Sequence, residues 1–199
     1  MSYFEFYPLR FWFAARDAIR LPAGKTGNLF RGQLGKILMR SAPRAYARLF
    51  APAAPTGGGP SGLHDPPRPF VFRANHLDGV RFPAGERFHI GINLFETREP
   101  VISAFEEALA TLGRESLGSE LASVDGRELL QLPLCAEAAV SRVRVRFLSP
   151  TELKTSERPE FGVLFARIRD RVSTLRELYG AGLWKSISRR WASAPGVCG

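Results

Sequence analysis

His76 and Lys25 are the first candidates for acid–base catalysis in this sequence. His76 stands in the segment Asn75–Asp78, which we expect to connect two strands, and Lys25 stands in the loop Pro22–Gly27. In a βαββαβ unit the first strand–helix loop and the middle hairpin lie at the same end of the fold. We therefore expect His76 and Lys25 to lie close enough to form a proton-transfer pair. A solvated hairpin histidine without a catalytic role is the alternative that the residues leave open.

Other motifs of catalysis or metal binding are missing from the sequence. The segment Gly24-Lys-Thr26 lacks the upstream glycine of a phosphate-binding loop, and no HExxH occurs. Cys135 and Cys198 do not stand in a metal-ligand spacing. His64 falls in a Pro/Gly-rich loop, and His89 falls on the polar side of an expected strand. We expect no metal and no cofactor.

The charge of the chain indicates the kind of partner. There are 28 Lys and Arg residues against 19 Asp and Glu, which gives a net charge of +9. Residues 1–50 carry a net +7, residues 51–139 carry −5, and residues 140–199 carry +7. Two basic ends favour a polyanion such as RNA, and arginine is suited to forked contacts with phosphate. A composition bias toward arginine is the alternative explanation of the same numbers.

The hydrophobic pattern predicts one α+β domain of the ferredoxin-like βαββαβ type over residues 1–132 and a partial second unit of the same type over 133–199. In the first domain we expect a helix with Asn28 as its N-cap, ending before Pro43. The long first strand is expected to break near Pro8. The expected strands are 3–15, 70–73, 85–95 and one within 120–132, and the second helix is 100–112.

In the second unit a strand and a helix are expected. Arg142, Arg144 and Arg146 alternate with apolar residues, which predicts a strand whose basic face is either a solvated edge or a polyanion surface. The helix is expected from Pro159 to Tyr179, ended by Gly180. Its apolar stripe should be buried against the first domain or a second copy of the chain, because large apolar side chains avoid water. The stripe consists of Phe161, Leu164, Phe165, Ile168, Val172, Leu175 and Leu178.

Residues 146–154 and 158–180 resemble the second-domain segment of the CRISPR precursor-RNA-processing endoribonucleases of the RAMP superfamily. Weaker similarity covers 30–35, 69–72, 82–86 and 94–95. The resemblance implies two tandem ferredoxin-like domains, RNA binding, and metal-independent cleavage of repeat RNA by attack of a 2′-hydroxyl. It also implies a general base, often His or Tyr, assisted by Lys or Arg.

The resemblance adds Lys36 and Tyr46 to the catalytic candidates His76 and Lys25, because the family often places its active site near the first helix. Expected partners are the repeat transcript and a second copy or other CRISPR-associated proteins. The family's further strands and glycine-rich loop have no counterpart after Gly180, so a non-catalytic RNA-binding subunit or an inactive truncated paralogue is the alternative. The RNA-binding candidates are Arg31, Arg40, Arg142, Arg144, Arg146, Lys154, Arg167 and Arg171.

The sequence also predicts where in the cell the protein is located. No apolar run approaches the roughly 20 residues that a membrane-spanning helix needs. The N-terminus lacks a basic segment followed by a cleavage site, so no signal peptide is expected. These features predict a cytoplasmic protein without a membrane partner.

Overall fold

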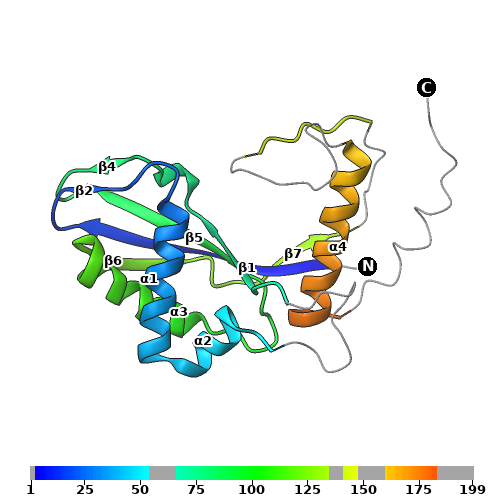
Figure 1. Cartoon of the computed structure of the whole chain (residues 1–199), viewed down its shortest axis with the longest axis horizontal. Coiled ribbons are helices and arrows are strands. Elements are labelled where there is room, and N and C mark those ends of the chain that lie inside the picture. Colours follow the sequence, from blue (N-terminus) through cyan, green and yellow to red (C-terminus); the bar gives the residue numbers. More distant parts are fainter. Residues whose placement is uncertain (1–2, 54–65, 135–140, 148–159, 183–199) are drawn as a thin grey trace, which may run out of the picture.

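The computed structural model describes residues 3–53, 66–134, 141–147 and 160–182. An antiparallel sheet with the strand order β3-β5-β1-β6 forms the centre of the molecule, and a further strand, β7, also pairs with β1 (Figure 1). The strands are β1 (Tyr3–Ala15), β3 (Phe70–Arg73), β5 (Arg87–Leu94), β6 (Ser119–Asp125) and β7 (Leu130–Pro133). A second, two-stranded sheet pairs β2 (Ile19–Arg20) with β4 (Arg81–Phe82).

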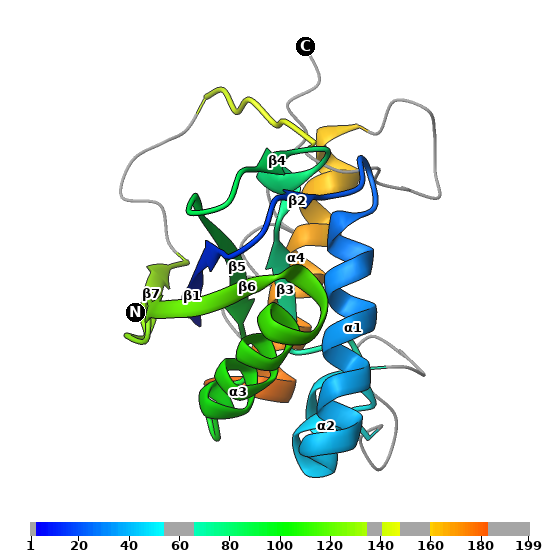
Figure 2. The same cartoon turned by 90° about the vertical axis from the view of Figure 1, so that its left-hand side faces the viewer.

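Two helices cover one face of the sheet, and this arrangement confirms the predicted α+β class and is consistent with a ferredoxin-like domain. Helix α1 (Thr26–Ser41) and helix α3 (Ile102–Leu112) lie side by side against it, and α2 (Pro43–Phe50) extends the chain beyond α1 (Figure 2). Alternate residues of β1 and β5 point into this layer because successive side chains of a strand face opposite sides. The fully buried side chains of the core include Leu9, Phe11, Phe13, Phe30, Leu34, Ile90, Ile92 and Phe105.

The start of α1 differs from the prediction, and the cause is a contact distant in sequence. The helix begins at Thr26, so the expected N-cap at Asn28 was wrong. The Thr26 backbone N–H donates to the Asp78 carboxylate at 3.2 Å, and its hydroxyl donates to the Pro22 carbonyl at 2.8 Å. Asp78 follows the short 3₁₀ helix Asn75–Leu77. The connection between β3 and β5 therefore does lie at the N-terminal end of α1, as the topology predicted.

Strand β1 continues through Pro8, where a break was predicted. It pairs with β5 from Tyr7 to Ala14, and the interruption lies in its other neighbour, where β6 gives way to β7. Gly126 stands in that interval with φ +74°, and a Cβ there would lie 2.3 Å from the Pro8 carbonyl oxygen. Only glycine combines this backbone conformation with so close an approach.

Replacing Gly126 with alanine should therefore destabilise the protein. We expect Gly126→Ala to lower the free energy of unfolding by about 1–3 kcal/mol, since the new methyl group forces a strained backbone or a displaced strand. Urea denaturation measures the change. Gly85→Ala is a matched control, because Gly85 also has a positive φ but its Cβ would meet open space. An equal loss of stability in both variants would show that the positive φ, and not the close approach to Pro8, causes the destabilisation.

The predicted strand around the three alternating arginines is absent. Residues 141–147 pair with none of the described strands and are all exposed. Val143 and Val145, the apolar half of the alternation, are 59% and 44% exposed. Alternation indicates a strand only where a neighbouring strand and a packed face are present, and the part of the chain that the structure describes provides neither for this segment.

The last described helix, α4 (Phe161–Tyr179), buries less of its apolar stripe than predicted. Leu175 and Tyr179 are buried, together with Phe6 of β1 and Phe95, in a small cluster separate from the main core. At the other end of the helix Phe161 and Ile168 are 55% and 50% exposed. Among the described residues the first domain therefore covers only the C-terminal part of the stripe, where α4 contacts it (Figure 1). Cover of the remaining part by a second copy of the chain stays a prediction.

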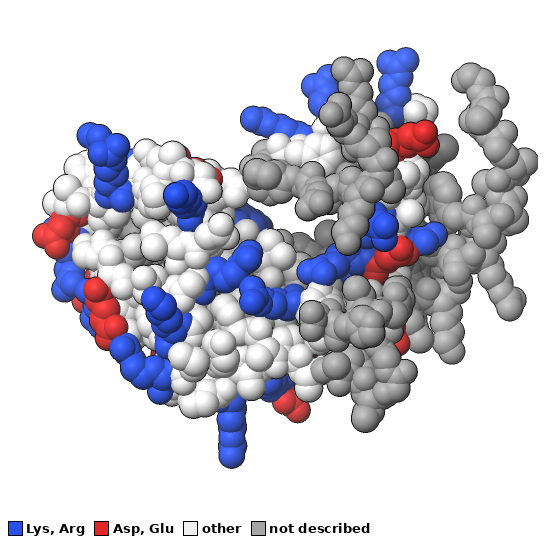
Figure 3. Space-filling model, viewed as in Figure 1, with Lys and Arg blue, Asp and Glu red and all other residues white. Residues whose placement is uncertain are grey.

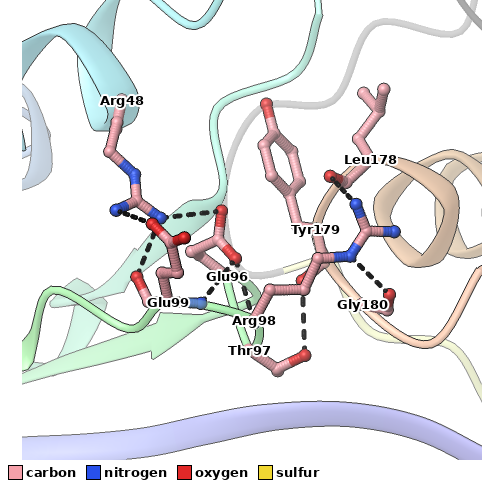
Figure 4. Close-up of polar contacts among 8 residues, drawn as sticks. All are labelled: Arg48, Glu96, Thr97, Arg98, Glu99, Leu178, Tyr179 and Gly180. Carbon is pink, nitrogen blue, oxygen red and sulfur yellow. Dashed lines mark hydrogen bonds and ion pairs between the residues drawn. The ribbon is translucent and has the colours of Figure 1, made fainter.

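A polar network fixes the C-terminal end of α4 to the segment after β5 (Figure 4). Arg98 donates to the carbonyl oxygens of Glu177, Leu178 and Gly180 at 2.9, 3.4 and 3.0 Å. These carbonyls have no partner within the helix, and a cation suits the negative end of the helix dipole.

Neighbouring contacts extend this network to α2. The Thr97 backbone N–H donates to the Tyr179 carbonyl at 2.9 Å. On the other side Arg48 of α2 forms ion pairs with Glu96 and Glu99 at 3.5 and 2.8 Å (Figure 4). Burial, assisted by Glu96, raises the pKa of Tyr179 to about 12, so its hydroxyl stays protonated and donates to the Pro67 carbonyl at 2.6 Å.

Of the helices that the structure describes, none is long and apolar enough to cross a lipid bilayer.

Candidate functional site

An open groove between α1 and α2 brings three of the predicted site residues together. Arg31 and Lys36 line it from α1, and Tyr46 lines it from α2. The groove has a volume of about 340 Å³. Arg68, which precedes β3, supplies a third positive charge, and none of the nine residues that line the groove is acidic. The groove is therefore a local concentration of positive charge that would attract an anion.

Two glycines of α1 and two aromatic rings of α2 give the groove its shape. A Cβ at Gly35 would lie 3.1 Å from the Phe50 ring, so the absence of a side chain lets α2 approach α1 closely. A Cβ at Gly32, one turn earlier, would meet nothing within 4 Å, which leaves the groove open there. The Tyr46 and Phe50 rings stack with centroids 5.5 Å apart and planes 4° apart. The guanidinium of Arg68 lies 5.4 Å from the centre of the Phe50 ring.

The groove contains the functional groups that phosphoryl-transfer chemistry on RNA uses. Tyr46 is half-buried and its hydroxyl has no hydrogen-bond partner among the described residues, while Arg31 and Lys36 are exposed. A phenolic hydroxyl can exchange a proton with a substrate hydroxyl. Lysine and arginine can stabilise the charge that develops on a phosphate in the transition state.

The predicted pair of His76 and Lys25 is not joined by a contact among the described residues. The His76 ring stacks instead on His89, with centroids 4.4 Å apart, and its Nε2 lies 3.1 Å from the His89 carbonyl oxygen. Lys25 is exposed where α1 begins. The two candidates share one end of the fold, and a common catalytic role for them stays a prediction.

The remaining basic candidates lie on several surfaces. Arg40 forms an exposed ion pair with Glu115 at 2.9 Å, a contact that contributes little in water and would not prevent RNA binding. Arg167 and Arg171 are exposed on α4. Lys154 lies outside the described residues. Arg142, Arg144 and Arg146 are exposed in the unpaired segment 141–147.

The space-filling view shows how these charges are distributed. Basic side chains outnumber acidic ones on the face seen in Figure 3 and are spread across both the sheet domain and the part around α4. Among the described residues no three His, Cys, Asp or Glu side chains are grouped so that they could hold a metal ion.

Sequence reasoning missed Arg68 and Phe50, which complete the groove. Their only signal was the clustering of basic and aromatic residues near the two ends of a Pro/Gly-rich segment. It also missed Trp12, whose ring lies 4.7 Å from that of His89 on the face of the sheet that α1 and α3 leave uncovered. In β1, Trp12 lies between the buried residues Phe11 and Phe13, so its side chain points to the side of the sheet away from the main core.

The comparison with protein families assigns most of the chain to a family. The model of the AF_1859 N-terminal domain matches residues 4–143. The matched region includes β1 from Phe4 onward, the other strands and the helices α1, α2 and α3, and it ends before α4. No curated protein matches the chain.

Proposed function

The chain belongs to the AF_1859 N-terminal domain family, and we propose that it is a cytoplasmic RNA-binding protein related to the endoribonucleases that cleave CRISPR repeat transcripts. The observation that carries this proposal is the groove between α1 and α2, where Arg31, Lys36 and Tyr46 meet. The resemblance of the sequence to those endoribonucleases and the basic charge of the chain support it.

In this proposal the reaction needs no group other than the RNA and the side chains of the groove. The phenolate oxygen of Tyr46 accepts the proton of a 2′-hydroxyl, whose oxygen forms a bond with the adjacent phosphorus. The bond from phosphorus to the 5′-oxygen breaks, and that oxygen takes up a proton from the Lys36 ammonium as it leaves. The products are a 2′,3′-cyclic phosphate and a 5′-hydroxyl. Lys36 and Arg31 stabilise the added negative charge on the phosphate.

Salt-dependent binding of a repeat-RNA hairpin tests the proposal. We expect the affinity to fall steeply with salt, because several arginines and lysines displace counterions from the phosphates. A double variant, Arg31→Ala with Lys36→Ala, should weaken binding and reduce the slope of log K against log salt by about 2, one for each lost phosphate contact. Filter binding at several salt concentrations gives both quantities.

Arg114→Ala is the control, because Arg114 is exposed on the π-helical turn Gly113–Leu117, lies outside the groove and donates a hydrogen bond to the Thr111 hydroxyl at 3.3 Å. It should leave the slope nearly unchanged. Absence of hairpin binding at ~50 mM salt would contradict the proposal. If the Arg114 control reduces the slope by half as much as the double groove variant, which loses twice as many charges, net charge alone and not the groove determines binding.

One observation favours RNA binding without cleavage as the second candidate function. The Tyr46 hydroxyl and the Lys36 ammonium have no side chain among the described residues that orients them, whereas a general base is usually held in place by a partner. A hairpin that binds through the groove but yields no cyclic phosphate would establish this second function.

A further inference from the structure

The uncovered face of the sheet carries a row of three aromatic rings that crosses three neighbouring segments. Trp12 of β1 pairs with His89 of β5, and His76 lies in the short 3₁₀ helix Asn75–Leu77 after β3. The ring centroids are 4.7 Å apart for Trp12 and His89 and 4.4 Å apart for His89 and His76. The row ends in an exposed ring, because His76 is exposed while His89 is half-buried.

Contacts hold this row in a fixed orientation. The Trp12 indole N–H donates to the Asp125 carboxylate of β6 at 2.7 Å. The His76 imidazole is anchored at the His89 carbonyl by the 3.1 Å contact. Rings that are fixed before binding lose little conformational freedom when a further ring stacks on them.

Arginines flank the aromatic row on both sides. Gly91 lies two residues after His89 in β5. It pairs with Arg10 of β1 on one side and with Arg73 of β3 on the other. Gly91 has no side chain, and Arg73 lies across it, since a Cβ there would be 3.1 Å from the Arg73 Cβ. On the opposite side the Arg87 guanidinium lies 5.8 Å from the centre of the Trp12 ring. Arg10, Arg73 and Arg87 are all exposed.

The pKa of His89 is lowered, which suits a ring that stacks with other aromatic rings. Burial is the main cause that holds the pKa of His89 below its usual value. His76, Arg10 and Arg73 lower the same pKa further. The central ring of the row is therefore neutral at neutral pH, and the positive charge of the face resides in the arginines around it.

We propose that this face binds an unpaired segment of RNA, with a base stacked on the exposed end of the row Trp12–His89–His76 and the flanking phosphates on Arg10, Arg73 and Arg87. Single-stranded nucleic acid is bound by aromatic rings combined with a basic surface, and single-stranded RNA stacks on the sheet face of other four-stranded domains of this kind. Helix α4 does not compete for the site, because it covers the sheet at the Phe6 and Phe95 end. The inference rests on the proposed RNA-binding function and assigns it a second site.

The charge and the apolar content of the face favour RNA over a protein partner. The exposed side chains beside the row are Arg10, Arg73 and Arg87. Two acidic residues lie on β6, where Asp125 accepts a hydrogen bond from Trp12 and Glu120 pairs with Ala14. Val71 is a large apolar side chain of β3 exposed beside them. A protein interface needs an apolar centre, whereas bases and phosphates need rings and guanidinium groups.

The test uses the tryptophan of the row as a reporter in the full-length chain. Trp184 and Trp191 are replaced by phenylalanine so that Trp12 is the only indole, and the protein is titrated with octa-adenylate RNA. We expect quenching of the Trp12 fluorescence, and we expect His76→Ala to weaken binding of this oligonucleotide by about five- to a hundredfold, which is the range for loss of one stacked base. Because His76 is exposed, the variant should fold, and circular dichroism confirms this.

Two controls separate stacking from charge and this site from the groove. Inorganic polyphosphate carries charge without bases and should bind without the full quench; an equal quench would overturn the stacking. The groove variant Arg31→Ala with Lys36→Ala should keep the quench by octa-adenylate while it weakens binding of the hairpin.

If His76→Ala and Arg10→Ala leave octa-adenylate binding unchanged, the second site is refuted while hairpin binding still decides the proposed function. If octa-adenylate binds and the hairpin does not, the sheet site stands and the proposed function fails.

Discussion

Replacing Tyr46 with phenylalanine is expected to slow cleavage of repeat RNA by about 10²-fold or more and to leave RNA affinity nearly unchanged. The substitution removes only the hydroxyl that is proposed to take the proton of the attacking 2′-hydroxyl, and such proton transfers contribute about 10²–10⁴-fold to rates. The phenyl ring can keep the stacked contact with Phe50, so the groove should retain its shape. Single-turnover cleavage and equilibrium binding of the same hairpin measure the two quantities.

Tyr7→Phe is the matched control, because Tyr7 packs beside the main core and away from the groove residues. It should leave the cleavage rate unchanged. If Tyr46→Phe cleaves at the rate of the unaltered protein while His76→Ala is slow, the acid–base role belongs to His76 with Lys25. If neither variant changes a measurable rate, Lys36 becomes the remaining candidate.

The fold could be predicted for strands in which the alternation of apolar and polar residues in the sequence matches the buried and exposed sides of the strand. In β5 the residues Phe88, Ile90 and Ile92 alternate with His89 and Gly91, and the structure buries the apolar set beneath the helices. Such a two-residue period is a local property of the chain, so it can be read without knowledge of neighbours. The order of strands and helices then limits the fold to few topologies.

The predictions that were wrong depend on contacts between distant residues. Asn28 was expected to cap α1, but the carboxylate of Asp78, 52 residues beyond Thr26, contacts the backbone N–H at the start of the helix. The arginine-rich alternation at 141–147 has the pattern of a strand but has no partner strand within the described ranges. In both cases the local pattern was compatible with the prediction, and tertiary structure determined the outcome.

The candidate site was only partly predictable for the same reason. Arg31 and Lys36 lie on one helix, and a helical face can be derived from sequence spacing. Their proximity to Tyr46 depends on the turn at Ala42, where α1 ends and α2 begins. The positions of Arg68 and of the row from Trp12 to His76 depend on the sheet register, which sequence spacing alone does not determine.

Placing a charge at Leu175 is expected to detach α4 from the domain. Leu175 is 4% exposed and packs with Phe6 and Phe95, so Leu175→Asp puts an unpaired carboxylate in an apolar cluster and removes a large apolar side chain. A buried leucine contributes about 2–5 kcal/mol, and the buried charge adds to the cost. We expect the helix to undock and the bonds from Arg98 to its last carbonyls to break. Limited trypsin digestion should then cut α4 at Arg167 or Arg171 much faster.

Ile168→Asp is the matched control on the same face of the same helix. Ile168 is 50% exposed, so the substitution should change the free energy of unfolding by no more than about 0.5 kcal/mol and leave the rate of digestion unchanged. Equal damage from both substitutions would mean that the exposed half of the stripe is covered in solution. Sedimentation would then show whether a second copy of the chain covers it, because Ile168→Asp would convert a dimer into monomers.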